Sequence, residues 1–337
     1  MLAIVCPGQG SQTPGFLSPW LELDGVRAHL GLLGAAAGLD LLAHGTESDA
    51  DTIKDTAVAQ PLIVAAGLVT GAVLLGADGG PGSGDTADTL ARACATAVLA
   101  GHSVGEFTAT ALAGVLPEEQ AMSLVATRGR AMAEASAATP TGMAAVLGGD
   151  HDEVLAAMER HGLTPANVNG AGQVVAAGTL EQIEAFRTEP PAKARVIPLQ
   201  VAGAFHTRHM SPAVVALTAA ADDLSPADPD RLLLSNADGR SVTDGADVLA
   251  RLVRQVSNPV RWDQCMETLM ALGVTGMVEL SPAGTLVGLA KRAMRGVETV
   301  ALKTPDDLYA ARALVLAHAT PAAPAGSVST SPREGTS

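Results

Sequence analysis

The sequence is poor in aromatic residues, with four Phe, two Trp and one Tyr among 337 residues. A core with so few rings has to be filled mainly by Ala, Val and Leu. Proteins that stack nucleic-acid bases use exposed rings, so the scarcity argues against that class of protein. Hydrophobic residues still make up 47% of the chain and charged residues 17%, which is typical of a folded chain of one large domain or two linked ones.

Positive charge is also scarce, because 21 Lys and Arg face 35 Asp and Glu, for a net charge of −14. Such an acidic chain is unsuited to nucleic acid or to an anionic membrane surface. An acidic protein partner would need a local basic patch.

Cysteines and long hydrophobic runs are few. Cys6, Cys94 and Cys265 form neither a CxxC motif nor a disulfide framework, so we expect free thiols in a reducing cytoplasm. The opening residues 1–12 are too short and too uncharged for a signal peptide. The apolar stretch 61–76 is interrupted by polar and glycine positions and is predicted to be too short for a membrane span. These features predict a soluble cytoplasmic protein.

The chain alternates strand-like and helix-like segments, which indicates the α/β class. After a buried-type strand over 2–6, the first part of the chain is predicted to contain a helix over 60–76, a flexible surface loop over 77–88, a strand over 96–101 and two helices, the second opening at Pro117.

The order of predicted strands and helices changes over residues 139–201. Strand, helix, strand, strand, helix and strand patterns follow one another there, which is the βαββαβ order of a ferredoxin-like subdomain. The chain then returns to the main body, with two further strands near 275–280 and 297–302. Residues 319–337 lack large apolar side chains and are predicted to be a disordered tail.

The stretch "TAVLAGHSVGEF" places Ser103 between a strand and a helix, within Gly-x-Ser-x-Gly. This is the nucleophile-elbow pattern, in which the glycines let backbone segments pass closely and the helix N-terminus faces a developing oxyanion. The alternative is a tight structural turn.

A nucleophilic serine needs a base. Of the eight histidines, His102 adjoins Ser103 but is expected to point elsewhere, and others lie on a predicted surface helix or by the tail. The loop "VAGAFHTRHM", with His206 and His209, is the best site for the base, although a solvated loop histidine is the alternative.

Arg128 shares a helical face with apolar side chains such as Leu124 and Met132. A guanidinium in an apolar stripe needs a carboxylate partner, since an unpaired buried charge is costly. That partner is either a structural Asp or Glu or the carboxylate of a substrate.

Several short blocks then occur in the order found in one family. They are "PGQGSQ" (7–12), "QP" (60–61), "GHSVGE" (101–106), "TRGRAM" (127–132), "NVNGAGQVVAAG" (167–178), "GAFHTRHM" (203–210) and "QVSNPVRW" (255–262). Over residues 3 to 305 the chain resembles the malonyl-CoA:acyl carrier protein transacylases, the FabD-like acyltransferases of fatty acid and polyketide synthesis. The resemblance implies an α/β-hydrolase-like large domain (1–138 and 202–318) with the ferredoxin-like subdomain (139–201) inserted.

The resemblance also assigns roles. It implies a ping-pong reaction in which Ser103 carries the malonyl group from malonyl-CoA to the thiol of holo-acyl carrier protein, with His206 as the base and no metal or bound cofactor. The backbone carbonyl of Gln255 would orient His206 in place of an Asp, and the backbone N–H groups of Gln9 and Val104 would form the oxyanion hole.

The same resemblance makes Arg128 the residue that binds the malonyl carboxylate, in a site to which Gln60, Asn167 and Met132 also belong. Relatives that accept methylmalonyl have a serine where Phe205 stands, so its ring is expected to exclude a 2-methyl group. Such a clash is worth about 1–3 kcal/mol, a strong but not absolute preference.

The chain departs from the family's pattern in two places. "ELSPAGTL" (279–286) replaces the usual Gly-Pro-Gly turn, which affects the expected loop shape, and the tail has no counterpart in the common short form.

Carrier proteins are acidic, so docking on this acidic chain calls for a basic area. Lys291, Arg292 and Arg295 are the first candidate, with Arg187, Lys193 and Arg195 as alternates and an ordinary solvated helix face as the other explanation. We expect a monomer.

Two rival functions share some of these features. A thioesterase-like serine hydrolase would have the elbow but would normally need a carboxylate in its triad and has no use for Arg128. A non-catalytic scaffold could keep the fold, although it would not need Ser103, His206 and Arg128 together.

Overall fold

The computed structural model describes residues 1–76 and 83–319. The strands are β1 Leu2–Cys6, β2 Val98–Gly101, β3 Thr141–Gly148, β4 Thr164–Gly170, β5 Gln173–Thr179, β6 Ala194–Pro198, β7 Leu233–Leu234, β8 Ser241–Val242, β9 Val260–Arg261, β10 Gly276–Glu279 and β11 Glu298–Ala301. The α-helices are α1 Val26–Ala37, α2 Leu41–Thr46, α3 Ala50–Lys54, α4 Thr56–Leu74, α5 Ser83–Cys94, α6 Gly105–Leu112, α7 Glu118–Ala138, α8 His151–Arg160, α9 Leu180–Thr188, α10 Ser211–Ala221, α11 Gly245–Gln255, α12 Trp262–Ala271, α13 Thr285–Ala293 and α14 Leu308–His318. Short 3-10 turns occur at Ser18–Glu22, Arg208–Met210 and Pro305–Asp307.

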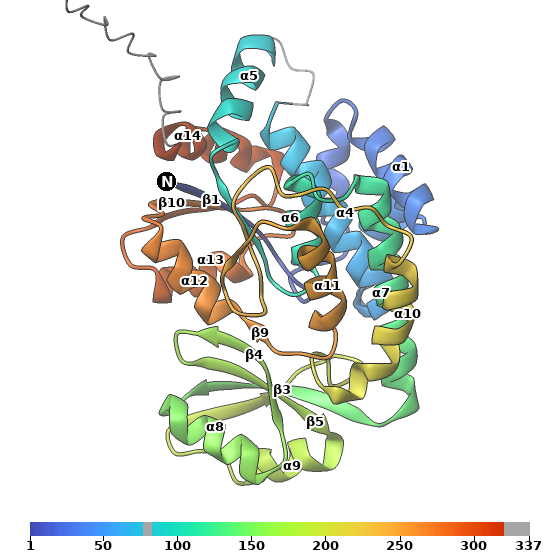
Figure 1. Cartoon of the computed structure of the whole chain (residues 1–337), viewed down its shortest axis with the longest axis vertical. Coiled ribbons are helices and arrows are strands. Elements are labelled where there is room, and N and C mark those ends of the chain that lie inside the picture. Colours follow the sequence, from blue (N-terminus) through green and yellow to red (C-terminus); the bar gives the residue numbers. More distant parts are fainter. Residues whose placement is uncertain (77–82, 320–337) are drawn as a thin grey trace, which may run out of the picture.

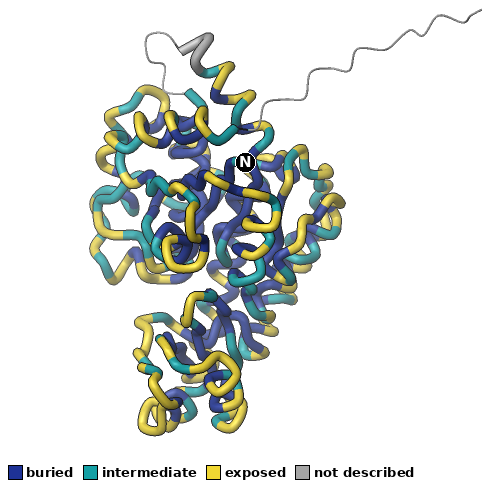
Figure 2. Tube along the Cα trace, turned by 90° about the vertical axis from the view of Figure 1, so that its left-hand side faces the viewer, coloured by how far each residue is buried: buried dark blue, intermediate teal, exposed yellow. Residues whose placement is uncertain are grey.

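The larger sheet has the strand order β11-β10-β1-β2-β7-β8 and is parallel apart from the last pair. Its central strands are buried on both faces, as parallel strands between two helical layers must be. Ile4 and Leu99 face one apolar cluster, which contains α4 and α7, whereas Ala3 and Val98 face the cluster that contains α12 and α13. Figure 2 shows this buried interior running through the upper body of the molecule.

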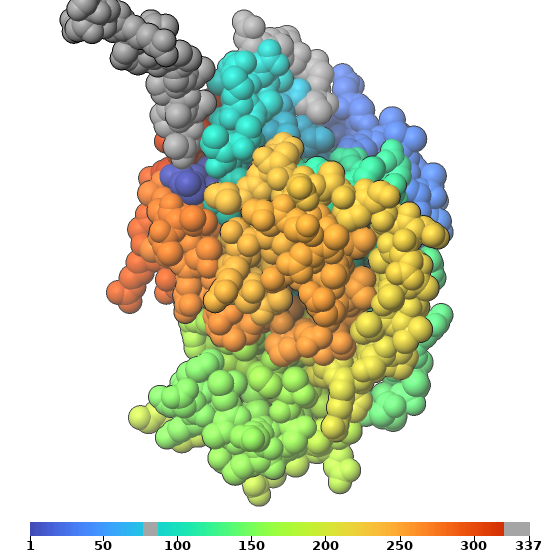
Figure 3. Space-filling view, in the orientation of Figure 1, coloured from blue at the N-terminus to red at the C-terminus, as the bar shows by residue number. Residues whose placement is uncertain are grey.

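The second sheet has the order β6-β3-β5-β4-β9. Its first four strands are antiparallel, and α8 and α9 pack on one face with side chains such as Met158 and Phe186. The predicted βαββαβ order is therefore present. Figures 1 and 3 show residues 139–201 forming one end of the molecule. The fifth strand, β9, comes from the main body and pairs in parallel with β4.

Helix α4 is apolar on all sides, and such a helix is stable in water only inside a core. It begins at Thr56, four residues earlier than predicted, because the Asp55 side chain accepts the backbone N–H of Ala57 at 2.8 Å. The expectation that this stretch is too short for a membrane span was wrong on length, since α4 has 19 residues and a mean hydropathy of 2.0. However, 83% of the 18-residue stretch over which this hydropathy is averaged is buried within the protein, as expected of a core helix.

Other local predictions need correction. The loop predicted over 77–88 is helical from Ser83, where α5 begins, and residues 77–82 lie outside the described residues. The two-residue strands β7, β8 and β9 were not predicted, because segments so short carry no periodic signal.

Of the predicted tail, residues 320–337 lie outside the described residues, and α14 ends at His318. The three cysteines are free and buried.

The sheet aligns two important loops. Cys6 and Gly101 are register partners at the carboxyl ends of β1 and β2, so the segments after them leave the sheet side by side. In α/β folds ligands bind at this edge. The loop with Gln9 and the elbow with Ser103 therefore meet where a site is expected.

Candidate active site

The elbow at Ser103 is fixed by close backbone contacts. Ser103 has a φ of 53°, in the left-handed region that side chains other than Gly, Asn and Asp rarely adopt. A Cβ atom at Gly101 would overlap the backbone of Gly105, and one at Gly105 would overlap the backbone of Cys6. Both glycines of the motif are thus required by packing.

Ser103 and His206 form a hydrogen-bonded pair. The Ser103 Oγ lies 2.8 Å from His206 Nε2, and His206 Nδ1 lies 2.8 Å from the backbone carbonyl oxygen of Gln255. Because a carbonyl only accepts, Nδ1 carries the hydrogen, which leaves Nε2 free to accept the serine proton. His206 is also in the left-handed region, with a φ of 60°.

Burial keeps this histidine neutral. His206 is 3% exposed, and desolvation, followed by the charge of Arg128, lowers its pKa to about 3. The imidazole is therefore in its basic form at neutral pH, as a general base has to be.

Arg128 reaches the same hydroxyl from α7. It is 1% exposed, and its Nη2 lies 3.5 Å from Ser103 Oγ. Nη1 donates to Gln60 Oε1 at 2.7 Å and Nη2 to Gln255 Oε1 at 2.9 Å. Within residues 1–76 and 83–319, Nε has no partner and no carboxylate forms an ion pair with this guanidinium. Its direct hydrogen-bond partners in the described residues include the neutral amides of Gln60 and Gln255, so the structural Asp or Glu considered as one alternative is not in contact with it, although Glu106 lies near enough to affect its pKa.

Burial lowers the pKa of Arg128, whereas a negatively charged neighbour raises it. Desolvation lowers its pKa to about 10, with a smaller opposing effect from Glu106, so the group stays cationic at neutral pH. The guanidinium also lies 5.7 Å from the centre of the Phe107 ring. A buried cation with an unused donor beside a nucleophile is well placed to bind an anionic group.

A cleft of about 270 Å³ opens between the two sheets at this point. Its lining contains most of the predicted site residues, namely Gln9, Gln60, Ser103, Val104, Met132, Asn167, Phe205 and His206. Arg128 and Gln255 join them through the hydrogen bonds described above. Gln60 also donates to Met132 Sδ at 3.5 Å. The structure therefore brings all ten predicted residues together.

Sequence reasoning missed several polar residues of this region. His102, expected to point elsewhere, does line the cleft, although its Nε2 is 2.9 Å from Asn169 Oδ1 and its ring packs against Trp262. Asn236 is fully buried, and its Oδ1 accepts the backbone N–H of Ser103 at 2.7 Å. The apolar run before "SNADG" could have drawn attention to Asn236 as a residue at a strand end.

Comparisons with known proteins agree with this geometry. Residues 3–305 match the family model described as "Acyl transferase domain". The chain is 51% identical to the malonyl CoA-acyl carrier protein transacylase of Mycobacterium tuberculosis, over 91% of this chain and 98% of that protein. It is 33% identical to the transacylase of the same name from Escherichia coli, with 92% and 98% covered.

Solved structures show the same likeness. The crystal structure of MCAT from Mycobacterium tuberculosis is matched with a TM-score of 0.84 and 50% identity, over 93% of this chain and 99% of that one. A type II polyketide synthase acyl carrier protein in complex with its malonyl-transacylase is matched with a TM-score of 0.81 and 29% identity, over 93% and 99%.

Proposed function

This chain belongs to the acyl transferase family, as a malonyl CoA-acyl carrier protein transacylase, and from that premise we propose that its chemistry runs through Ser103, His206 and Arg128. The enzyme transfers the malonyl group from malonyl-CoA to the phosphopantetheine thiol of holo-acyl carrier protein, for fatty acid or polyketide synthesis. The observation that carries the proposed mechanism is that one hydroxyl, Ser103 Oγ, contacts both the neutral imidazole and the buried guanidinium.

The proposed reaction has two halves. Ser103 Oγ attacks the thioester carbonyl of malonyl-CoA while His206 Nε2 takes its proton. The C–S bond then breaks, and the departing CoA sulfur receives that proton from His206. In the second half, the carrier-protein thiol gives its proton to His206 and attacks the malonyl-serine ester, after which Ser103 regains the proton.

The oxyanion of each tetrahedral intermediate is proposed to be bound by the backbone N–H groups of Gln9 and Val104. Gln9 lines the cleft, and Val104 precedes the first turn of α6, where the helix dipole also favours negative charge. His206 is oriented by a carbonyl and not by a carboxylate, which departs from the triad that a thioesterase-like hydrolase normally uses.

Arg128→Ala tests the acyl-group assignment. If the guanidinium binds the malonyl carboxylate, its removal leaves a desolvated charge unpaired at a cost of about 3–5 kcal/mol, or on the order of 10²–10³-fold or more in malonyl loading. Acetyl-CoA has no carboxylate, so acetyl loading should not fall. The measurement is the ratio of malonyl to acetyl loading of Ser103 by mass spectrometry, with folding checked by thermal melting. Equal losses for both acyl groups would mean that Arg128 has a structural role only.

The pKa of His206 predicts the acid limit of the reaction. Because that pKa is lowered to about 3, well under the value of about 6.5 for a free histidine, the base stays neutral in mildly acidic solution. The acid limb of kcat/KM for malonyl loading should therefore lie below pH 6.5. It would be measured from about pH 8 to about pH 5. An acid limb at 6.5 or higher would contradict the proposed environment of the base.

The lowered pKa of His206 also makes the stability of the folded protein depend on pH. A depressed folded pKa means that the native state binds fewer protons than the unfolded chain between pH 3 and 6.5. The stability linked to His206 is present above that window and is lost as the pH falls through it. Circular dichroism at each pH separates acid unfolding from protonation of the base.

Carrier-protein docking is proposed at Lys291 and Arg292, in the last turn of α13, and at Arg295, which follows the helix; all three are exposed. The start of that helix lines the cleft, and Arg292 donates at 3.2 Å to the Oε1 of Gln173, which also lines it. Among the alternates, Arg187 is already paired with Glu184 at 2.6 Å. Charge reversal at Lys291 and Arg295 should slow transfer to the carrier protein and leave loading from malonyl-CoA unchanged. If the variant transfers malonyl to the carrier protein as fast as the wild type, docking at this patch is excluded.

We further propose that the enzyme is a cytoplasmic monomer. The acidic surface charge and the three buried free thiols support this assignment. Light scattering tests the oligomeric state, and cell fractionation tests the location.

A further inference from the structure

Glu106 is a buried carboxylate that the proposed mechanism does not use. It lies in the first turn of α6, three residues after the nucleophile, and is 5% exposed. Its Oε1 accepts the backbone N–H of Asn236 at 2.8 Å, and its Oε2 accepts a short hydrogen bond from Gln255 Nε2. Burial raises the pKa of this carboxyl to about 7, so the group is a full carboxylate above that pH, and placing it here has a cost that a purely apolar side chain would avoid.

The contact with Glu106 fixes which way the Gln255 amide points. A carboxylate can only accept, so it takes the NH₂ end of the amide, and the backbone oxygen of Ser103 is a second acceptor at 3.1 Å from the same nitrogen. The amide oxygen is thereby directed at Arg128, where it accepts from Nη2 at 2.9 Å. Reversal of the amide would set NH₂ against the guanidinium.

Glu106 also supports the elbow through Asn236. The Asn236 Oδ1 accepts the backbone N–H of Ser103, and its Nδ2 donates to the carbonyl of Gly101 at 2.6 Å. Asn236 therefore binds the chain on both sides of the left-handed turn, and Glu106 holds the Asn236 backbone in place. One carboxylate thus reaches both the nucleophile and Arg128, each time through an amide.

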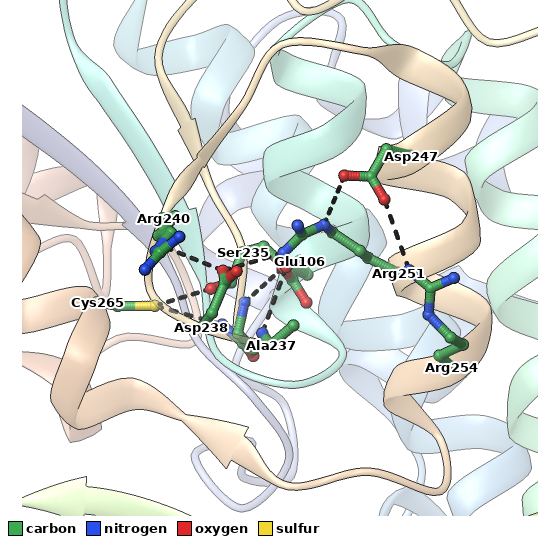
Figure 4. Close-up of polar contacts among 10 residues, drawn as sticks. Glu106, Ser235, Ala237, Asp238, Arg240, Asp247, Arg251, Arg254 and Cys265 are labelled. Atoms are coloured by element: carbon green, nitrogen blue, oxygen red, sulfur yellow. Dashed lines mark hydrogen bonds and ion pairs between the residues drawn. The ribbon is translucent and has the colours of Figure 1, made fainter.

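Nearby cations do not compete for Glu106. A second cavity, of about 320 Å³, is lined by Glu106 and Gln255 together with Arg251, Arg254 and Arg261. These arginines have carboxylates of their own. Arg251 pairs with Asp247 at 2.8 Å and Asp238 at 2.9 Å, Arg254 with Asp247 at 3.5 Å and Arg261 with Asp263 at 2.7 Å, and Figure 4 shows Asp247 in contact with two of them.

Charge balance explains why an amide stands between Glu106 and Arg128. A carboxylate in direct contact would satisfy the guanidinium and compete with an anionic substrate. With Gln255 between them, the negative charge of Glu106 stabilises the buried cation of Arg128 without direct contact. The guanidinium keeps neutral partners and remains able to bind a carboxylate.

We propose that Glu106 is a positioning residue that selects for an acyl group with a carboxylate, by holding the Gln255 amide oxygen on Arg128 and keeping the balancing charge one residue away. The proposal rests on the proposed function of Arg128 as the malonyl-binding residue. It assigns no contact between Glu106 and substrate.

Two isosteric variants test it. In Glu106→Gln, the new side chain can still accept from Asn236, but its NH₂ faces the NH₂ of Gln255, which favours reversal of that amide. Malonyl loading should fall about 10–100-fold, the range for losing a hydrogen bond to a charged group, and acetyl loading by no more than a few-fold. In Gln255→Glu, a carboxylate is placed directly on Arg128 while the main-chain carbonyl for His206 remains. Malonyl loading should again fall at least 10-fold more than acetyl loading.

Glu184→Gln is the control for loss of a carboxylate elsewhere in the chain. It removes a carboxylate that pairs with Arg187 on α9 and contacts neither Gln255 nor Arg128, and both loading rates should stay at the wild-type level. Single-turnover loading with malonyl-CoA and acetyl-CoA at about pH 8, above the pKa of Glu106, with thermal melting of each variant, gives the comparison. If Glu106→Gln fails to fold, Gln255→Glu decides alone.

The outcomes are distinguishable. Equal losses of malonyl and acetyl loading in both variants, or no loss in either, would overturn the positioning role. If Arg128→Ala is selective for malonyl while these variants are not, the proposal fails and the function of Arg128 stands. If Arg128→Ala lowers both rates equally, the proposed role of Arg128 in binding the malonyl carboxylate itself fails.

Discussion

Ser103→Ala is expected to abolish the acyl-enzyme completely. Ser103 Oγ is the hydroxyl on the elbow, hydrogen-bonded to a neutral imidazole, and an alanine there leaves His206 without a nucleophile to activate. After mixing with malonyl-CoA, intact mass spectrometry should show one added malonyl group on the wild type and none on the variant. The effect should exceed that of any other single substitution, because water held in the same place cannot form the covalent intermediate.

Ser136→Ala provides a control for loss of a buried serine hydroxyl. The Ser136 Oγ donates to the carbonyl of Met132 at 2.8 Å and does not reach the base, so malonyl loading should persist. Peptide mapping identifies the modified residue. A stable malonyl group mapped to a residue other than Ser103 would overturn the assignment of the nucleophile.

His206→Ala is expected to have the second-largest effect. Without the imidazole, no group takes the Ser103 proton, and loading should slow by roughly 10²–10⁴-fold. The loop should still fold, because the backbone N–H of His206 donates to the carbonyl of Val256 at 3.1 Å, a bond that alanine retains. The left-handed φ of this residue makes some loss of stability expected as well.

His209→Ala separates the two histidines of this loop. His209 lies in the short turn Arg208–Met210, where its backbone N–H bonds to Thr207 Oγ1. Pre-steady-state rates of malonyl loading for both variants would be compared. If His209→Ala were the more damaging change, the base would have been assigned to the wrong residue.

The main features of fold and site could be predicted because they depend on local patterns. The glycines around Ser103 have to be small for a contact that the motif itself creates, and the alternation over 139–201 predicts each helix and strand of the subdomain. The order of short blocks then identified the family, and the family supplied the roles of His206 and Gln255, which lie about 100 and 150 residues from Ser103.

The supporting residues could not be predicted in the same way. Glu106 was visible as a charged residue at a helix start, which is ordinary, and nothing local indicates that it contacts residue 236 or residue 255. Such contacts depend on the packing of α6 against distant loops. The two-residue strands β7 and β9 are similar cases, because their conformation comes from the strand beside them.

The pairing of β9 with β4 has a consequence for how the protein is made. During synthesis, residues 139–201 leave the ribosome about sixty residues before Val260, the first residue of β9, so the smaller sheet emerges with the edge of β4 uncovered. An uncovered edge can pair with another chain. Strand β9 then covers that edge and joins the subdomain to the main domain beside the cleft. A nascent chain stalled before residue 260 would therefore be more prone to aggregation than its length suggests.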